Sequence, residues 1–496
     1  MTHGLVCTVA TPRVKMSPRP SRRRENEAIF VSANTDAHGR ETVDLLVLGG
    51  DIVTMSAERR VIRDGAVAVR ENRIAWVGPA AEARGRFQAV RTIEAAERIV
   101  LPGLVDTHFH TGQQLLRGKI SELARRRQLK LPIWRNYLIP FESVLTEEDM
   151  HLSAQIAYAN LLRVGTTCFA DAGGPHPHEM ARAAMELGIR GLVAQSTMDM
   201  GDGLPPSMRF STQKAIEHNV SLIKTWGVSA VEQRVGAWLS LRQLLVCSRE
   251  LWEAFRDLSD ESGSRVHIHL AEGTYEVDYA AEHWGKRPAE YLEMLGFLGP
   301  RVHAAHSILL SADEIGLYAE RHVSAAHCPL GNFLIGPPKV PEMRRRAIHV
   351  GLGTDGASTG SLDLFEAMRV SFVAIQSLYA TPWHDRSALS LEDLLEMATL
   401  EGAKALGVGD HVGSLEVGKL ADLVIANPGN WDLQPVYDPM FTASRGLTGR
   451  DVETVVVDGE VVVEGGVVST VDEAELRGRL AERWPEIMSR FESTTN

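Results

Sequence analysis

The sequence predicts an α/β fold, namely a (β/α)8 TIM-like barrel with a small β-sandwich domain formed from both flanks of the chain. Three observations lead to this prediction. Strand-like and helix-like segments alternate through the middle of the 496-residue chain, and short strands with tight turns precede and follow that middle. Histidine and acidic residues stand where the predicted middle strands end, and active sites of (β/α)8 barrels lie at the carboxyl ends of their strands.

The barrel prediction rests on eight short segments that are apolar and rich in β-branched residues. They span residues 100–106, 166–170, 189–194, 234–239, 266–270, 302–305, 323–326 and 347–353. Helical segments lie between them, for example at 150–163, 250–261 and 312–321, where apolar residues recur at three- and four-residue spacing. Eight parallel strands joined by crossover helices make a barrel.

The flanks of the chain have a different pattern. Short strands are predicted at 43–48, 52–55, 66–70 and 74–77 before the middle, and at 422–426, 454–457 and 461–463 after it. Both flanks are expected to build one sandwich. The predicted division is a disordered basic leader (1–42), two sandwich segments (43–100 and 412–470), a metal-dependent catalytic barrel (101–411) and a C-terminal helix (471–496).

The composition is that of an ordinary soluble enzyme, with 44% hydrophobic and 6% aromatic residues. The formal net charge of −12 argues against a nucleic-acid partner, because phosphate binding needs a basic face. The one basic run, Arg13–Arg24, has no apolar segment after it, so we interpret it as a solvated leader rather than an export signal. No run of eighteen apolar residues occurs, so we expect no membrane span.

The four cysteines are far apart and form no CxxC pair. This spacing excludes a cysteine-based zinc module and fits a reducing cytoplasm, where we expect the protein to be located. Cys168, Cys247 and Cys328 are expected to be buried thiols.

Two histidines follow the first predicted barrel strand. A strand places residues i and i+2 on one face, so His108 and His110 can direct two imidazole nitrogens at one point. The fifth predicted strand carries His269, with Glu272 three residues further on. His267 is the alternative ligand on this strand, although the spacing to Glu272 favours His269.

Two further strands end in candidate site residues, His306 and Asp355. Each has a structural alternative, because His306 could be a buried, hydrogen-bonded histidine and Asp355 could cap the turn at Gly356. His303 is expected to be structural or exposed. His327 either lines the pocket or packs in the interior.

These motifs resemble the amidohydrolase superfamily, from about residue 43 to about residue 468. In that family a first-strand HxH, a fifth-strand His, a sixth-strand His and an eighth-strand Asp surround one divalent metal. The resemblance implies that the ligands are His108, His110, His269 and Asp355. Neutral imidazoles and a carboxylate suit zinc, with iron(II) as the alternative. One ion is expected, because the stretch 235–241 has no lysine to bridge a second.

The motifs HLAE (269–272) and GTDG (353–356) resemble the mononuclear deaminase branch of this family. A bound divalent ion lowers the pKa of its water to roughly 7, which gives hydroxide at neutral pH. The resemblance implies that Glu272 shuttles the proton and that His306 contacts the attacking water or the developing anion. It also implies that Asp355 doubles as ligand and proton acceptor.

Three more residues are candidate substrate contacts. Gln113 follows the second histidine by three residues, as in oxopurine deaminases and triazine hydrolases. Glu142 resembles a glutamate that binds ribose hydroxyls in nucleoside deaminases, although a plain helix-surface glutamate is an equal alternative. Arg242 stands where nucleoside deaminases of this branch carry a pocket histidine, and its fixed cation would favour an anionic or carbonyl-rich ligand.

The resemblance therefore implies a hydrolase acting on non-peptide carbon–nitrogen bonds, a deaminase of the cyclic amidine type that releases ammonia. Its substrate is expected to be an aminated nitrogen heterocycle or nucleoside, either like adenosine, S-adenosylhomocysteine or methylthioadenosine or like a purine or pterin. The alternative is a hydrolase of the triazine type that displaces chloride or an alkylamine. A remote alternative is a non-catalytic scaffold, although no ligand is missing. The expected partners are a small heterocyclic substrate and further copies of the chain, in a homodimer or larger oligomer.

Overall fold

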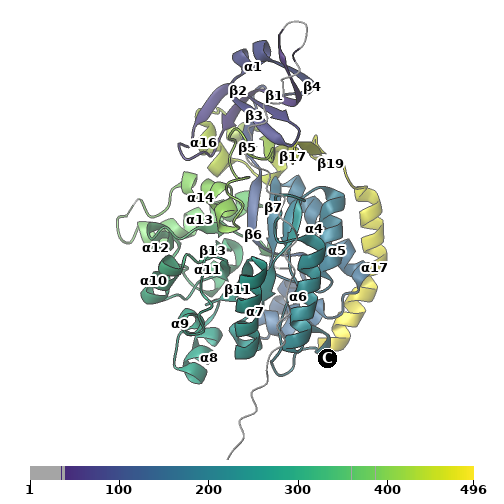
Figure 1. Cartoon of the computed structure of the whole chain (residues 1–496), viewed down its shortest axis with the longest axis vertical. Coiled ribbons are helices and arrows are strands. Elements are labelled where there is room, and N and C mark those ends of the chain that lie inside the picture. Colours follow the sequence, from purple (N-terminus) through teal and green to yellow (C-terminus); the bar gives the residue numbers. More distant parts are fainter. Residues whose placement is uncertain (1–34, 36–38, 359, 386, 496) are drawn as a thin grey trace, which may run out of the picture.

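The computed structural model describes residues 35, 39–358, 360–385 and 387–495, so the predicted leader lies almost wholly outside the described residues. The strands form a nine-stranded sheet built from both flanks of the chain and two five-stranded parallel sheets between them (Figure 1). The chain is therefore a mixed α/β protein, as predicted. Within the described ranges, no helix has the length and apolar character needed to cross a membrane.

The two parallel sheets correspond to the predicted barrel strands. One has the order β15 (Asp355–Gly356), β6 (Leu104–His110), β7 (Thr166–Asp171), β8 (Arg190–Val193) and β9 (Val235–Ala237), and the other β10 (Leu239–Leu241), β11 (Val266–Leu270), β12 (Val302–His306), β13 (Ser324–His327) and β14 (Val350–Leu352). The edge strands of the two sheets follow each other directly along the chain. A single residue separates β9 from β10, and two residues separate β14 from β15.

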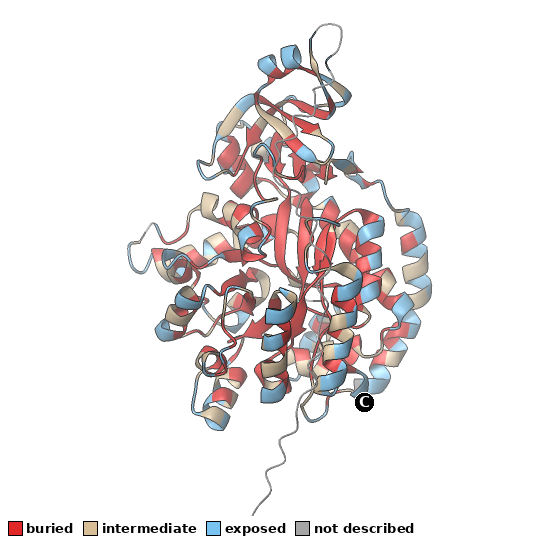
Figure 2. Ribbon diagram, viewed as in Figure 1, coloured by how far each residue is buried: buried red, intermediate tan, exposed pale blue. Residues whose placement is uncertain are grey.

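Helices cover these strands, and their outer faces are exposed while the strands between them are buried (Figure 2). They include α2 (Lys119–Arg125), α3 (Ile139–Glu142), α4 (Glu147–Arg163), α5 (Pro177–Leu187), α6 (Thr212–Trp226), α7 (Arg249–Ser262), α8 (Thr274–Trp284), α9 (Pro288–Met294), α10 (Ala312–Arg321), α11 (Pro329–Ile335), α12 (Val340–Arg345), α13 (Leu364–Ile375), α14 (Leu391–Met397), α15 (Leu400–Ala405) and α17 (Glu473–Thr495). Thr146, Ser248 and Ser311 each cap a helix by accepting a backbone hydrogen bond from three residues on.

The predicted first barrel strand, 100–106, is wrong in its bounds. β5 (Ile99–Pro102) pairs with β1 and β16 in the nine-stranded sheet, and β6 begins only after Gly103. A Cβ at Gly103 would overlap the side chain of Thr167. Glycine therefore lets the chain pass close to β7 as it changes sheets. β6 then continues through both histidines of the HxH motif and carries them to its carboxyl end.

The nine-stranded sheet joins the two flanks, as expected. Its order is β19 (Val467–Val468), β18 (Glu460–Glu464), β17 (Val452–Val457), β16 (Leu423–Ala426), β5, β1 (Glu41–Val53), β2 (Val61–Arg70) and β3 (Arg73–Pro79), with β4 (Phe87–Glu94) paired to β1. The predicted strands 43–48 and 52–55 are one strand, β1, whose register with β2 shifts around Gly50. Such a shift lets a strand continue past a point where the alternation of its side chains between the two faces of the sheet is interrupted.

A buried ion pair ties this sheet to β8. Arg190 donates to the carboxylate of Asp422 through Nε at 2.8 Å and Nη2 at 3.0 Å, and both side chains are almost fully buried. Arg190 also contacts Asp458 in the β17–β18 turn at 3.2 Å. Two parallel hydrogen bonds fix orientation as well as distance. The nine-stranded sheet is thus held against the amino end of β8, and the candidate site residues lie at the opposite ends of the strands.

Candidate active site

The ends of β6 and β11 and the start of β15 bring the four predicted ligands together. Nε2 of His110 lies 3.2 Å from Nε2 of His269. Oδ1 of Asp355 lies 3.4 Å from Nε2 of His108 and 3.6 Å from Nε2 of His110. The ligand atoms of the three histidines lie within 4.8 Å of one another. Three imidazole nitrogens and one carboxylate oxygen therefore converge on one point.

This donor set fits one divalent ion. Ligand atoms that lie 2.0–2.1 Å from a tetrahedral zinc ion are about 3.3 Å apart, and the observed separations are 3.2, 3.4 and 3.6 Å. Nε2 of His108 is buried and has no hydrogen-bond partner among the described residues. A buried nitrogen without a partner is rare in folded proteins, and a metal would supply the missing contact.

Electrostatics favour the metal-binding form of each residue. Burial lowers the pKa of His108 to about 4. Burial, and after it the positive charge of Arg242, lowers the pKa values of His110 and His269 well below the ordinary range. Burial alone would raise the pKa of Asp355, but the neighbouring His108 holds it well below its ordinary value. The imidazoles are therefore neutral and the carboxylate is ionised at pH 7, as metal ligands must be.

His267 lies behind this cluster rather than in it. Its Nε2 is 2.9 Å from Nδ1 of His108, the ring nitrogen that faces away from Asp355. The geometry therefore favours His269 over His267 as the ligand on β11. His303 is buried against the backbone and is structural, since its Nε2 lies 2.9 Å from the carbonyl oxygen of residue 107.

One amide holds His306 in the same pocket. Nδ1 of His306 lies 3.1 Å from Oδ1 of Asn332, and Nδ2 of Asn332 donates to the His306 carbonyl oxygen at 3.3 Å. Because an amide oxygen only accepts, Nδ1 carries the ring proton and Nε2 is left as an acceptor. His327 lies on the far side of Asn332, with its Nε2 3.1 Å from the hydroxyl of Ser371, so its position is structural.

The carboxylate of Glu272 is held from one side. Gln243 donates to its Oε2 through Nε2, and the hydroxyl of Tyr275 donates to the same oxygen at 2.9 Å. The backbone N–H of Glu272 donates to the buried carboxyl of Glu276 at 3.0 Å. One oxygen of Glu272 is thus fixed by two donors, and Oε1 is left for other contacts.

Gln113 and Glu142 form a buried pair. Nε2 of Gln113 donates to Oε1 of Glu142 at 3.1 Å, and Ser358 donates to Oε1 of Gln113 at 3.2 Å. Glu142 is only 1% exposed, so the alternative of a helix-surface glutamate is wrong. Burial raises the pKa of this carboxyl. Its Oε2 has no hydrogen-bond partner within the described ranges.

Arg242 is a buried cation to which the described residues offer no counter-ion in direct contact. It follows β10 and is 2% exposed, yet its guanidinium makes no hydrogen bond or ion pair in the described part of the chain. Its charge acts on His110, His269 and Glu142. An unpaired buried charge is unfavourable, so this guanidinium is available to a ligand that carries a carbonyl or an anionic group.

Backbone strain concentrates at the same strand ends. Ala271 (φ 51°), His306 (φ 68°), Ser307 (φ 49°) and Asp355 (φ 62°) all adopt left-handed conformations. Holding a residue in such a conformation lowers the stability of the fold by about 1–3 kcal/mol, and strain of this kind clusters at functional sites. These left-handed conformations turn the chain sharply where β11, β12 and β14 end.

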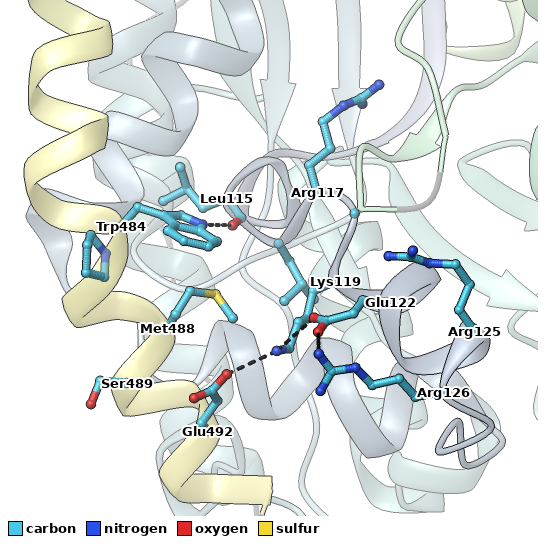
Figure 3. A pocket seen from close by; sticks show the side chains of 13 residues that line it. Leu115, Arg117, Lys119, Glu122, Arg125, Arg126, Trp484, Met488, Ser489 and Glu492 are labelled. Atoms are coloured by element: carbon cyan, nitrogen blue, oxygen red, sulfur yellow. Dashed lines mark hydrogen bonds and ion pairs between the residues drawn. The ribbon is translucent and has the colours of Figure 1, made fainter.

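Helix α17 supports the substrate side of the site from outside. Figure 3 shows Trp484 of α17 facing the segment that follows the HxH motif, beside a cavity of about 730 Å³. Nε1 of Trp484 donates to the carbonyl oxygen of Leu115 at 3.1 Å. The ring of Phe491 packs on Phe141 of α3, with centroids 5.4 Å apart. The two elements that carry Gln113 and Glu142 are therefore both anchored to α17.

Sequence reasoning missed four side chains of this site. Three of them, Gln243, Tyr275 and Asn332, orient a candidate residue through hydrogen bonds. The fourth, Cys328, lies with its Sγ within 4.8 Å of ligand atoms of His108 and His306, and burial raises its pKa well above the ordinary value. For two of them, the position in the sequence could have pointed to the site, because Gln243 directly follows Arg242 and Cys328 directly follows β13. The three described cysteines are buried and free, as predicted.

Residues 99–462 match the family model described as the amidohydrolase family, and residues 65–87 match the bacterial imidazolonepropionase-like composite domain. The first match spans most of the chain and includes every candidate ligand. The chain belongs to the amidohydrolase family. The family resemblance inferred from the motifs is thus confirmed.

Relatives of this amidohydrolase are similar along most of its length. A 5-methylthioadenosine/S-adenosylhomocysteine deaminase from Moorella thermoacetica is 32% identical over 426 residues, which is 85% of this chain and 95% of the relative. The crystal structure of an adenosine deaminase from Xanthomonas campestris with bound zinc has a TM-score of 0.84 at 29% identity, covering 91% of this chain and 100% of that one. Atrazine chlorohydrolase from Arthrobacter aurescens TC1, complexed with zinc, has a TM-score of 0.77 at 25% identity, covering 89% and 100%.

Proposed function

We propose that this amidohydrolase is a metal-dependent deaminase that hydrolyses an aminated nitrogen heterocycle or nucleoside and releases ammonia. The observation that carries the proposal is the convergence of His108, His110, His269 and Asp355 on one point, with Glu272 on the segment that leaves the same strand as His269. The deaminases among its relatives support this reaction.

The four convergent residues would hold one divalent ion, zinc or, as the alternative, iron(II). Zinc in the two solved relatives supports zinc here. When bound, such an ion supplies the Lewis acidity that makes hydroxide available near pH 7. The absence of lysine from residues 235–241 supports a single ion.

The side chains of the site move the protons. Oε2 of Glu272 accepts two hydrogen bonds, so Oε1 takes a proton from the attacking water and delivers it to the ring nitrogen. Nε2 of His306 accepts a hydrogen bond from that water, because Nδ1 is committed to Asn332. The ionised Asp355 then accepts the remaining proton of the water, and Glu272, having protonated the ring nitrogen, relays this proton to the departing amine. One water is consumed, and ammonia and a ring carbonyl are formed.

Gln113, Glu142 and Arg242 would bind the substrate. The unpartnered Oε2 of Glu142 would accept from a hydroxyl or N–H, and the unpartnered Nη1 of Arg242 would donate to a carbonyl or anionic group. The two charges influence each other but form no ion pair in the described part of the chain. A ligand that carries both a donor and an acceptor would satisfy both side chains.

The test is ammonia release from zinc-loaded protein over a panel of adenosine, methylthioadenosine, S-adenosylhomocysteine, guanine, oxidised purines, pterins and aminotriazines. We expect release from one substrate class and a loss of about 100-fold or more in the Glu272→Gln variant, because a positioned acid–base group contributes at least that factor. No ammonia from any compound, with metal bound, would refute the proposal.

A second candidate function is displacement of chloride or an alkylamine from a triazine-like ring. Gln113, the arginine at position 242 and the likeness to atrazine chlorohydrolase favour it. Mass analysis of the products separates the two functions, because this reaction yields chloride or an alkylamine and no ammonia.

We also propose that the two parallel sheets close into one eight-stranded barrel, in which β9 with β10 and β14 with β15 each form one strand. The nine-stranded sheet would fold over as a sandwich. The direct chain passages at β9–β10 and β14–β15 support the barrel. One apolar cluster shared by β1, β2, β5 and β16 supports the sandwich. The proposed division keeps the expected segments: 43–100 and 412–470 form the sandwich, and 101–411 forms the barrel. Gly103, where the chain changes sheets, lies close to the first boundary.

We further propose a homodimer or larger oligomer in the cytoplasm. The aromatic side chains of Trp431 and Tyr437 are 93% and 90% exposed, and aromatic residues are enriched at protein–protein interfaces. The free thiols of the three described cysteines support a reducing compartment. Analytical ultracentrifugation would measure the assembly, and a monomer at micromolar concentration would contradict it.

A further inference from the structure

Gln243 has a buried amide that is bonded on one side only. The residue is 1% exposed. Its Nε2 donates to Oε2 of Glu272 and, at 3.2 Å, to the hydroxyl oxygen of Tyr275. Its Oε1 is buried and has no hydrogen-bond partner among the described residues. Buried amide oxygens almost always have a partner, so this oxygen needs an explanation.

The neighbouring donors and acceptors fix the orientation of this amide. Nε1 of Trp134 can only donate, and it lies 3.0 Å from the Tyr275 hydroxyl. The Tyr275 oxygen therefore accepts from Trp134, and its own proton goes to Glu272 at 2.9 Å. A carboxylate only accepts, so Gln243 must present Nε2 to Glu272. Oε1 of Gln243 then points away from Oε2 of Glu272, and the planar amide of Gln243 fixes its position.

The departing amine has to come close to Glu272. In the proposed reaction, the proton carried by Glu272 ends on the substrate, and a proton donor must lie within hydrogen-bond reach of its acceptor. Oε1 of Gln243 belongs to an amide that is hydrogen-bonded to Glu272. An acceptor without a hydrogen-bond partner among the described residues therefore lies on the same amide as the nitrogen that contacts Glu272, close to the carboxylate that carries the proton.

We propose that Oε1 of Gln243 accepts a hydrogen bond from the amino group that leaves, while Nε2 of Gln243 and the hydroxyl of Tyr275 hold Glu272 in position. This inference rests on the proposed deaminase function. The hydrogen bond strengthens as the amine gains a proton, because charged donors bind more strongly, so it favours the transition state over the ground state. Gln243 thus selects a leaving group that carries N–H, and Tyr275 is a positioning residue.

The test compares two leaving groups on one ring. The probes are the best amino compound of the ammonia-release panel and the same ring with a methoxy or chloro group at the reacting carbon. Gln243→Met keeps the length of the side chain and removes both amide functions. We expect kcat/KM for the amino compound to fall about 10-fold further than kcat/KM for the other compound, because one hydrogen bond to the amine is lost. An equal fall for both compounds would overturn the acceptor role.

Two further variants separate the two halves of the amide. Tyr275→Phe removes one donor to Glu272 and keeps Oε1 of Gln243, so kcat should fall by the same factor for both compounds with KM unchanged. Gln243→Glu keeps an acceptor and removes the donor, so both rates should fall while the preference for the amine stays. A lost preference in either variant would contradict the proposal.

Each variant is checked by thermal unfolding, so that a loss of the fold is not read as a loss of the contact. If Gln243→Met does not fold, Gln243→Leu, which also removes both amide functions, is measured with the same two compounds and decides the question. A wild-type protein that binds metal and releases ammonia from no compound would instead refute the proposed function, and this inference with it.

Discussion

Nδ1 of His108 lies 2.9 Å from Nε2 of His267, while Nε2 of the same ring faces Oδ1 of Asp355 at 3.4 Å. The two histidines of β11 therefore do different things, although both point to the same side of the strand. The ring nitrogens of His269 lie among the converging atoms that could hold a metal, and His267 contacts the His108 ring from behind. Partners of this kind fix the ring orientation of metal-bound histidines.

Replacement of each histidine of β11 should separate these positions. We expect His269→Asn to lose its metal on dialysis, because one of four donors is gone. His267→Asn should keep one metal per chain but bind it 10- to 100-fold more weakly, as is typical when such a partner is removed. Elemental analysis after equilibration with graded chelator concentrations measures both. Loss of metal from the two variants at the same chelator concentration would contradict the assignment.

Glu142→Gln tests the substrate side. The amide oxygen of the new side chain can still accept from Gln113, so the local packing is kept while the negative charge is removed. We expect KM for a nucleoside substrate to rise about 10-fold, because one charge-assisted hydrogen bond is lost, with kcat nearly unchanged. The exposed Glu147→Gln is the matched control. Unchanged KM in Glu142→Gln would show that this carboxylate does not bind the substrate.

Asp149 links helix α4 to α17. Its fully buried carboxylate accepts from Arg483 at 2.7 Å and from Arg490, and it completes the cap of α4 at Thr146. Removal of one partner of a buried ion pair leaves the other unpaired, so Asp149→Asn should lower the free energy of unfolding by about 2–3 kcal/mol.

The neighbouring Glu148 gives the control. It also contacts Arg483, at 3.1 Å, but its side chain is 66% exposed, and exposed ion pairs contribute less than about 1 kcal/mol. Urea unfolding of Asp149→Asn and Glu148→Gln measures the difference. Equal unfolding free energies for the two variants would show that α17 is not anchored through Asp149.

Glu401 should make stability depend on pH. Burial alone would raise its pKa, but hydrogen bonds with His349 and Lys404 hold the pKa at about 2. Because this value lies below the ordinary 4.5, ionised Glu401 stabilises the fold above about pH 4.5, and this contribution is lost as the pH falls toward 2. Glu401→Gln should therefore be less stable than wild type by about 1 kcal/mol at pH 7, allowing for solvent screening, and equally stable near pH 2. A difference that does not shrink on acidification would contradict this explanation.

The convergence of the four candidate ligands could be expected from sequence because strand spacing and the family resemblance point to the same residues. The spacing of His108 and His110 places both on one face of a strand, and the resemblance adds His269 and Asp355 near strand ends. That these residues bind a metal stays a prediction. The break at Gly103 was missed because apolar residues on both sides of it suggest one continuous strand, although the pair Pro102-Gly103 is typical of a turn. The close approach of β7, which requires glycine at position 103, appears only in the structure.

Side chains that act through distant partners also escaped prediction. Gln243 meets Glu272 from 29 positions away, and Asn332 meets His306 from 26 positions away. Apart from the place of Gln243 next to Arg242, nothing in the local sequence of either residue marks these contacts. The burial of Glu142 likewise depends on the packing of α17 on α3, where Phe491 lies against Phe141. Such features follow from tertiary packing rather than from spacing along the chain.

A zinc titration of the metal-free protein tests the central claim most directly. Ammonia release from the best amino substrate is recorded as zinc is added, for the wild type and for Asp355→Asn. We predict that wild-type activity rises in proportion to added zinc and becomes constant at one zinc per chain, while Asp355→Asn stays nearly inactive throughout. Full activity before zinc is added, or activity that rises until two zinc ions are bound per chain, would contradict a single metal held by His108, His110, His269 and Asp355.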